Sequence, residues 1–473
     1  MRKLAVIGAG AAGSMFVAAL LRQHRPGSLA ITWLRGRQHA GRGVAYSTQA
    51  DEHLLNVRSA GIGLHPDAPS EFLDTLRASD RTVRGGDFLP RRVYGDYLQA
   101  GTQRCVDDAL QRGHRIEFVD ADAHALRESA VGLHIHDDLG VRHDVEDAVL
   151  AIGALPACPL AAVRRDAQES GRYLRNPWQT PDPVETPRHI LIIGTGLTAV
   201  DAILSAARQW PQAQLTAISR HGCLPREHGE VPAAPYAHQA SLHAALLETP
   251  SLRQWLRLVM DTIRHEPGLD WRAVVDGLRP ATTQLWSALD VAERGRFLRH
   301  VRWLWEASRH RMPPASARQI GDLRASGRLR VVAGHVHDVC GSAPLAVYWR
   351  ARGRRRPERS EACLVIQATG LGTDVRNTDH PLMRQLVGEG LVGADPLGLG
   401  IAAEASGQVL RPDGSPWPRV HALGTLLRGK VWECSGLPEI RSSAQRLAAA
   451  LGPAPLTRRH MQILGGQFAV APP

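Results

Sequence analysis

Leu4-Ala-Val-Ile-Gly8-Ala-Gly10-Ala-Ala-Gly13 opens the 473-residue chain, between a strand-like apolar run and the helical run 14–21. The first glycine permits a tight turn, and the second lets backbone approach a pyrophosphate. The third small residue lets the helix pack on the strand. The pattern returns as Ile190-Leu-Ile-Ile-Gly194-Thr-Gly196-Leu-Thr-Ala199. Two ordinary glycine-rich turns are the alternative, but the pairing favours two dinucleotides, most often FAD with NAD(P)H.

Composition places the chain among soluble globular proteins, with 44% hydrophobic and 22% charged residues and room for two or three domains. The net charge of +11 admits contact with nucleic acid, with a membrane surface or with anionic small molecules. The basic residues are scattered, and the densest run, 350–356, is expected to be a solvated loop. We therefore expect a small-molecule substrate and neither a nucleic-acid nor a membrane partner. The oligomeric state stays open.

The cysteines exclude several classes of protein. They are widely spaced and include no Cys-x-x-Cys pair, which argues against a dithiol reductase, a zinc ribbon and a secreted disulfide framework. No metal site is expected, because the 22 histidines include no zinc-binding motif. A reducing cytoplasm fits best. The apolar start of the chain fits strand, turn and helix better than it fits a signal peptide.

The order of the segments predicts an α/β fold with two Rossmann-like dinucleotide-binding domains, the FAD domain being split around the NAD(P)H domain. The expected parts are 1–175 for the first part of the FAD domain, 188–330 for the NAD(P)H domain with a helical insertion over 241–326, and 331–455 for the return part. The proline-rich connector 176–187 is a credible boundary. Expected elements are strands at 29–34, 214–219 and within 329–368, a meander of 116–119, 132–136 and 145–152, and helices over 88–112 and 438–451.

Three strand ends bear on the cofactors. Ala368-Thr369-Gly370 matches the turn that leads back to the dinucleotide in flavin-binding folds, and Leu150-Ala-Ile-Gly153 is a looser version. The strand after the first fingerprint should end in an acid that binds the ribose, but Arg35 stands there. The corresponding strand of the second unit ends at Arg220. This residue could accommodate the 2′-phosphate of NADPH or lie exposed, so NADH and NADPH both stay open.

Longer strings resemble a bacterial flavoprotein group that includes an FAD-dependent urate hydroxylase and the aspartate N-monooxygenases of diazo and nitroso natural-product pathways. The similarity runs over most of the chain. The strings that carry it are Gly41-Arg-Gly43-Val-Ala-Tyr46-Ser, His53-Leu-Leu-Asn56-Val57, Phe88-Leu-Pro-Arg91-Arg92-Val-Tyr94-Gly-Asp-Tyr97, Gly194-Thr-Gly196-Leu-Thr-Ala-Val-Asp201, Ala217-Ile-Ser-Arg220-His-Gly-Cys-Leu-Pro225, Arg296-Phe-Leu-Arg-His300 with Trp305, Arg309-His310-Arg311-Met, Arg428-Gly-Lys-Val-Trp432-Glu433 and Pro438-Glu-Ile-Arg441.

The resemblance implies an FAD-dependent monooxygenase. NAD(P)H would reduce FAD, O2 would give a flavin C4a-hydroperoxide, and one oxygen atom would reach the substrate. The preferred substrate is urate, hydroxylated to 5-hydroxyisourate in purine breakdown, since Arg and His could bind its charge and Trp its flat faces. The first alternative is N-oxygenation of an amino acid such as aspartate. The second is a non-catalytic, basic flavoprotein associated with nucleic acid.

The fingerprints and the resemblance together assign the site residues. Those for FAD are Gly8, Gly10, Gly13, Gly43, Tyr46, Asn56, Thr369 and Gly370, and those for NAD(P)H are Gly194, Gly196, Ala199 and Arg220. The catalytic residues are not identified. Candidates for the substrate pocket are Asn56, Arg91, Arg92, His300, Trp305, His310 and Arg311.

Each pocket candidate also has a structural interpretation. Helical Trp at three- and four-residue spacing is more often core, and the charged residues between are more often a solvated face. Arg91 could cap a helix or pair with an acid, and Asn56 could be a turn amide. Glu433 could be a general base, but an acid paired with Arg441 is favoured.

Overall fold

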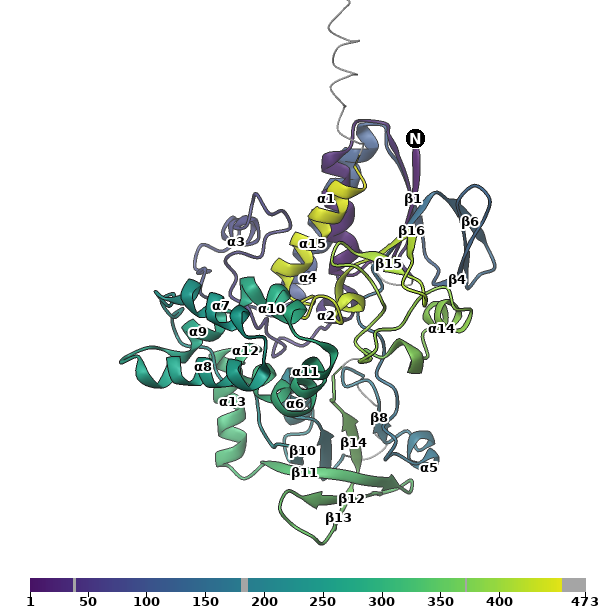
Figure 1. Ribbon diagram of the computed structural model, residues 1–473. Coiled ribbons are helices and arrows are strands. Elements are labelled where there is room, and N and C mark those ends of the chain that lie inside the picture. Colours follow the sequence, from purple (N-terminus) through teal and green to yellow (C-terminus); the bar gives the residue numbers. More distant parts are fainter. Residues whose placement is uncertain (37–39, 180–185, 371, 453–473) are drawn as a thin grey trace, which may run out of the picture.

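The computed structural model describes residues 1–36, 40–179, 186–370 and 372–452. The first fingerprint lies in a six-stranded, mostly parallel sheet at the top of Figure 1. Its strand order is β15 (Gln408–Leu410), β16 (Pro416–Ala422), β7 (Asp147–Leu150), β1 (Arg2–Ile7), β2 (Leu29–Leu34) and β3 (Arg115–Val119). The return part of the chain thus completes the sheet that the N-terminus begins.

Both faces of the first sheet are covered. The helices α1 (Ala11–Gln23), α4 (Arg91–Gln111) and α15 (Leu437–Ala450) pack together, and their apolar side chains share one core with β1 and β2. The second core joins the sheet to the antiparallel strands β4 (Ala123–Glu128), β5 (Leu133–Asp137) and β6 (Arg142–Val145) and to α14 (Pro381–Gly388). Short helices α2 (Gly43–Tyr46) and α3 (Glu71–Arg77) lie in the loops before α4.

The predicted meander is partly wrong. Of the three predicted segments, only that of β5 lies in the antiparallel meander β4–β5–β6, whereas β3 and β7 pair in parallel with β2 and β1. Every residue of β7 is buried, as expected of a strand with neighbours on both sides. Apolar runs of this length look alike in either sheet, so the sequence could not separate them.

The second fingerprint lies in a seven-stranded sheet at the bottom of Figure 1. The order is β13 (Glu358–Ala362), β12 (Leu345–Ala351), β11 (Leu329–Cys340), β10 (Gln214–Ser219), β9 (His189–Ile193), β14 (Leu364–Gln367) and β8 (Tyr173–Leu174). The helices α6 (Leu197–Gln209) and α13 (Pro314–Ala325) share a core with this sheet, and α5 (Arg165–Glu169) lies near β8 and β11.

The sheet does not follow the expected division of the chain. Residues 331–367, expected in the return part of the FAD domain, belong to this second sheet, where β11 pairs with β10 and β14 pairs with β9, so the chain returns to the first sheet only after β14. The strand β8, expected before the boundary, is the edge of this sheet. Half of the connector, residues 180–185, lies outside the described residues, as do the last three residues of the expected return part, 453–455.

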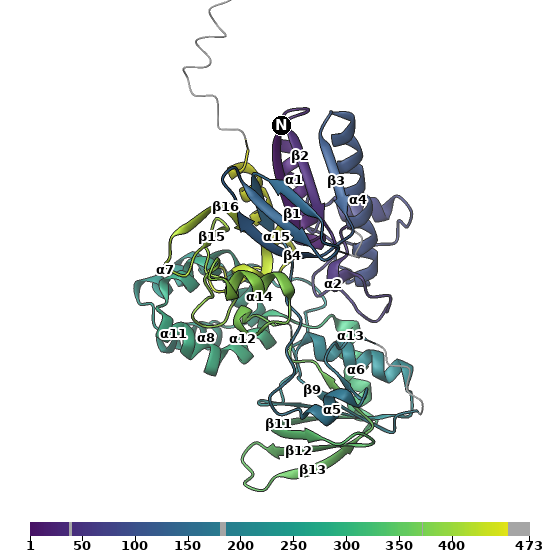
Figure 2. The same ribbon diagram turned by 90° about the vertical axis from the view of Figure 1, so that its right-hand side faces the viewer.

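A helical segment follows β10 and lies beside the junction of the two sheets in both views (Figures 1 and 2). It consists of α7 (Gln239–Glu248), α8 (Leu252–His265), α9 (Trp271–Gly277), α10 (Thr282–Ala288), α11 (Val291–Arg296), a π-helical turn (Phe297–Val301) and α12 (Arg302–Arg309). Trp286 and Phe297 pack with Leu399 and Trp432 of the return part. The segment is therefore anchored to the first unit, whereas α13, expected in the same insertion, packs on α6. Among the described residues, no helix is long and apolar enough to span a bilayer.

Candidate functional site

The first fingerprint forms the tight turn that its glycines predict. Gly8 has φ +109°, and a Cβ there would overlap the carbonyl oxygen of Ala151. A Cβ at Gly13 would overlap the carbonyl oxygen of Gly8, and Gly10 lies close to Gly43. Backbone therefore approaches closely at the N-terminus of α1, where free N–H groups can meet a pyrophosphate. This cradle fits FAD.

The second fingerprint repeats this geometry. Gly194 has φ +131°, and a Cβ there would overlap the carbonyl oxygen of Ala368. A Cβ at Gly196 would have no described atom within 4 Å, which leaves room for a ligand. Ala199 is fully buried where α6 crosses the sheet. These residues fit the pyrophosphate of a second dinucleotide.

Two residues assigned to FAD adjoin the second cradle instead. The turn Ala368-Thr369-Gly370 follows β14, which pairs with β9, so it stands beside Gly194. The matching neighbour of the first cradle is Ala151, which precedes the looser turn at Gly153. Because the two turns are so alike in sequence, only strand pairing separates them.

Tyr46 lies in the first core, against Tyr94 at 5.2 Å between ring centroids. Burial raises the pKa of its phenol. Its ring therefore supports the cradle through packing.

An acid does stand near the end of β2, but it comes from the neighbouring strand. Asp120 follows β3, and its Oδ1 lies 2.5 Å from Nε of Arg35. The Arg35 guanidinium also covers the ring of Phe118 at 4.5 Å. A carboxylate is therefore present at the edge where the sequence indicates none, because parallel pairing sets the two strand ends side by side.

Arg91 joins the two units. It is the first residue of α4, and its guanidinium pairs with Asp201 of α6. Both side chains are largely buried, with 16% and 12% of their surface exposed. Arg92 pairs instead with Asp51 at the surface. Of the two interpretations of Arg91, the structure supports pairing with an acid.

His53 lies at the same junction. Its Nδ1 lies 2.7 Å from the hydroxyl of Thr48, and its Nε2 lies 2.8 Å from that of Ser205 on α6. Burial lowers the pKa of His53, although the nearby Asp201 opposes the shift. A neutral imidazole thus bridges the loop after α2 and the second unit.

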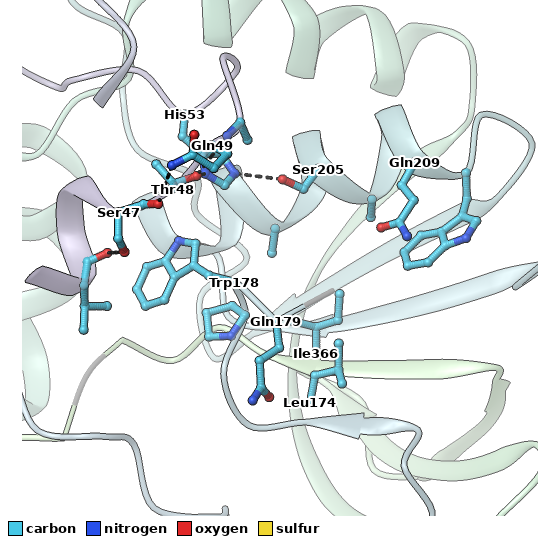
Figure 3. A pocket seen from close by; sticks show the side chains of 16 residues that line it. Ser47, Thr48, Gln49, His53, Leu174, Trp178, Gln179, Ser205, Gln209 and Ile366 are labelled. Atoms are coloured by element: carbon cyan, nitrogen blue, oxygen red, sulfur yellow. Dashed lines mark hydrogen bonds between the residues drawn. The ribbon is translucent and has the colours of Figure 1, made fainter. Parts of the chain in front are cut away.

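A cavity of about 380 Å³ opens beside His53 (Figure 3). It lies between the loop after α2, the helix α6 and the segment that carries Trp178. Hydroxyl and amide groups from Thr48, Ser205 and Gln209 line it, and none of the sequence-predicted pocket residues does.

His228 is a junction residue that the sequence did not reveal. Arg311 donates from Nε to Nδ1 of His228 at 3.3 Å, so the proton of the neutral ring is on Nε2. That nitrogen donates to the carbonyl oxygen of Asn56 at 3.1 Å. Burial, reinforced by Arg311, lowers the pKa of His228 to about 4. No sequence motif surrounds His228. Its hydrogen-bond partner Arg311, a predicted pocket residue, is the feature of the sequence that points toward this place.

Arg311 is almost fully buried and holds Asp276 of α9 through two hydrogen bonds of 2.6 and 2.8 Å. It therefore connects the helical segment to His228, and through His228 to Asn56. Asn56 and Arg311, two of the predicted pocket residues, therefore lie together at the junction and are linked by hydrogen bonds through His228.

The helix α12 carries a second polar network. Trp305 donates from Nε1 to Glu433 at 3.3 Å, and Arg309 lies 3.7 Å from the same carboxylate. The favoured pairing of Glu433 with Arg441 is wrong, because Arg441 donates to carbonyl oxygens of the loop before α3. Folding brings α12 against the return part, which no local pattern indicates.

Glu306 is the other acid of α12. It accepts a hydrogen bond of 2.7 Å from Arg428 and lies 3.3 Å from His310. Burial opposes its ionisation, but His310, Arg428 and Arg302 together hold its pKa below the ordinary value. The structure thus brings His310 into this network. His300 is exposed, and its carbonyl accepts a hydrogen bond from Trp303, so its side chain is not brought into the network.

Three arginines lie where α12 packs against the return part, and we call them the cationic wall: Arg302, Arg309 and Arg428. Burial lowers the pKa of Arg302 and of Arg309, so each guanidinium is poorly solvated. The Nε atoms of Arg309 and Arg428 are buried and have no hydrogen-bond partner among the described residues. Arg428 also covers the ring of Trp432 at 4.4 Å. Unpaired buried donors beside an aromatic face suit a planar or carboxylate-bearing anion.

Comparison with known proteins agrees with this geometry. A protein family described as FAD-NAD(P)-binding matches residues 5–155. An uncharacterized protein of Escherichia coli K12, YdhS, is 25% identical over 224 residues, which span 44% of this chain and 40% of that protein.

Solved structures resemble the whole chain. An ornithine N-hydroxylase from Kutzneria sp. 744 with reduced FAD, NADP+ and L-ornithine has a TM-score of 0.61 at 16% identity, covering 95% of this chain and 99% of that one. An L-lysine 6-monooxygenase from Pseudomonas syringae gives 0.63 at 16%, with coverage of 95% and 99%. A cadaverine monooxygenase from Erwinia amylovora, bound to FAD, gives 0.61 at 11%, with coverage of 94% and 92%.

The fold is therefore that of the FAD- and NAD(P)-binding flavoproteins. More particularly, residues 5–155 are an FAD/NAD(P)-binding domain, and the chain shares its whole architecture with flavin-dependent amine hydroxylases.

Proposed function

We propose that this protein is an FAD-dependent, NAD(P)H-consuming monooxygenase that oxygenates a nitrogen atom of a small amino acid. The observation that carries the proposal is the group of Arg302, Arg309 and Arg428, formed where α12 meets the return part. Its buried, unpartnered Nε atoms on Arg309 and Arg428 suit a substrate carboxylate. Enzymes with this architecture act on ornithine, lysine and cadaverine, which all carry an amine.

FAD, when bound, supplies electron transfer from NAD(P)H to O2 and delivers one oxygen atom. The chain binds the two pyrophosphates at Gly10 and Gly196 and holds the units together through Arg91. Glu306 stays ionised beside Arg428, so the guanidinium is oriented before substrate arrives. Trp305 of α12 and Trp432 of the return part pack into one apolar cluster beside these arginines. The proposed compartment is the cytoplasm, because widely spaced cysteines suit a reducing environment.

Urate has no support from the proteins compared above, although its anion could also meet these arginines. N-oxygenation of an amino acid, the sequence-based alternative, is closer to what they do. Urate hydroxylation is therefore an outcome to test, not the proposal.

The test is NAD(P)H oxidation by the FAD-loaded protein with O2 and a panel of aspartate, glutamate, ornithine, lysine, cadaverine and urate. We expect one amino acid to accelerate oxidation and to yield a product heavier by one oxygen atom on nitrogen, seen by mass spectrometry. Stimulation by urate alone, with loss of its absorbance, would refute the proposal. A flavin-loaded protein that no member stimulates would also count against it.

A variant tests the role of the wall. Arg428→Met removes a charged donor, so we expect KM for the carboxylate substrate to rise about 10- to 100-fold. The matched control is Arg299→Met, which removes an exposed arginine of the same segment and should leave KM unchanged. If Arg428→Met and Arg299→Met have the same KM for the amino acid, Arg428 does not bind the carboxylate.

A further inference from the structure

A group of cationic side chains gathers at the carboxyl end of β10. We call it the cationic cluster and define it as Arg220, His221, His335, Arg350 and Arg352. Strand pairing brings these residues together from three neighbouring strands. Ser219 of β10 pairs with Ala333 of β11, and the next residue of β11 pairs with Ala351 of β12. Arg220, His335 and Arg352 follow these positions and Arg350 precedes Ala351, so the residues meet at one edge of the sheet.

Contacts fix the arrangement of the cluster. Arg352 donates from Nη1 to Nδ1 of His221 at 3.3 Å, and its backbone N–H donates to the carbonyl oxygen of Ala333 at 2.8 Å. The His221 ring stacks on Trp303 of α12, with 4.5 Å between centroids and 15° between planes. His335 pairs with Arg350 across the two strands. The helical segment and the second sheet thus both hold His221 in place.

The cluster adjoins the second cradle. The hydroxyl of Ser219, one residue before Arg220, lies 2.8 Å from that of Thr195, which stands between Gly194 and Gly196. The following turn is pressed against β11, since a Cβ at Gly222 would lie 2.6 Å from the backbone nitrogen of Ala333. A dinucleotide whose pyrophosphate lies at Gly196 directs its adenosine ribose toward the end of the next strand, which here is β10.

The charges of the cluster are not balanced locally. Among the described residues, no carboxylate lies within 4 Å of a guanidinium nitrogen of Arg220, Arg350 or Arg352. Burial lowers the pKa of His221, and Arg352 and Arg220 lower it further. Burial also lowers the pKa of His335, with Arg220 and Arg350 contributing. Like charges this close oppose one another, and an anion would relieve that repulsion.

We propose that the cationic cluster binds the 2′-phosphate of NADPH, chiefly through Arg220 and Arg352, and so selects NADPH over NADH. This inference rests on the proposed function only in naming the electron donor. An NADH site places an acid where it can accept from the 2′-hydroxyl, whereas a 2′-phosphate requires cationic donors. A solvated basic surface would not need the stacked imidazole and the paired strand ends that hold these donors beside the cradle.

The test is calorimetric binding of two nucleotides to the FAD-loaded protein, with no turnover required. The nucleotides 2′,5′-ADP and 5′-AMP differ only in the 2′-phosphate. We expect 2′,5′-ADP to bind at least about tenfold more tightly, because two charge-assisted hydrogen bonds contribute. Equal affinities for the two nucleotides would overturn the proposal.

Variants locate the effect. Arg352→Ala and Arg220→Ala should each reduce the preference for 2′,5′-ADP about tenfold and leave 5′-AMP binding unchanged. The matched control is Arg359→Ala on β13, whose guanidinium pairs with Glu361 and which removes the same charge one strand farther out. If Arg359→Ala reduces the preference as much as Arg352→Ala does, the effect is general surface charge and the site is refuted.

The outcome is separable from the proposed reaction. Tight 2′,5′-ADP binding by a protein that oxygenates no member of the substrate panel would leave this site standing and refute the monooxygenase. If substrate stimulates the oxidation of NADH and of NADPH with equal kcat/KM, the monooxygenase stands and the 2′-phosphate site is refuted.

Discussion

His228 should titrate far below an ordinary histidine, and this can be measured directly. Its pKa of about 4, against 6.5 for a free imidazole, follows first from burial and then from Arg311. The folded pKa is depressed, so the neutral ring stabilises the fold above pH 6.5. This stability is lost as the pH falls from 6.5 toward 4, because the unfolded chain binds the proton first. The difference corresponds to about 3 kcal/mol at about 1.4 kcal/mol for each tenfold change in protonation equilibrium.

The measurement is the exchange of the imidazole C2 hydrogen with deuterium, followed by mass spectrometry of the peptide that contains His228. Its rate, recorded from about pH 3 to about pH 8, gives the pKa of that ring. Arg311→Met should raise this pKa, but not to 6.5, because burial is the larger cause. Arg318→Met, which removes an exposed arginine paired with Glu230, should leave it unchanged. A wild-type pKa above about 6, or no change in Arg311→Met, would refute this account of the junction.

Stability should follow the same titration. Between pH 7 and pH 5 the melting temperature of the wild type should fall more than that of His228→Gln, which has no imidazole to protonate. Comparing the two proteins removes the contribution of the other histidines with depressed pKa. Equal falls in both would show that His228 does not couple protonation to folding.

Two further changes probe the cradle and the junction. Gly8→Ala should abolish most flavin binding, because its Cβ would overlap backbone. The measurement is the absorbance of bound FAD per chain. The control is Gly140→Ala, which has φ +81° in open space and therefore tests backbone conformation alone. Retained flavin in Gly8→Ala would contradict the assignment of the first cradle. Arg91→Met and Asp201→Asn should each destabilise the protein by about 3–5 kcal/mol, since each leaves a buried partner uncompensated. Thermal melting of the double variant should then show less than the summed loss, and an additive loss would show that the two residues do not interact.

The local elements of this protein could be predicted from the sequence alone. Both fingerprints form the predicted strand, turn and helix, and the strands at 29–34 and 214–219 have the predicted bounds. The α/β fold with two dinucleotide-binding units is confirmed. These features depend on residue spacing and glycine stereochemistry, which act over a few residues.

Tertiary structure decided which segments meet. It placed β11–β14 in the second sheet, set Thr369 beside Gly194, and paired Glu433 with Arg309 in place of Arg441. It also made a junction residue of His228, and it gathered Arg220 and Arg352 at one edge from strands more than a hundred positions apart. Strand pairing and helix packing are long-range contacts between surfaces that look alike in sequence. Their partners are fixed only when the whole chain buries its apolar faces together.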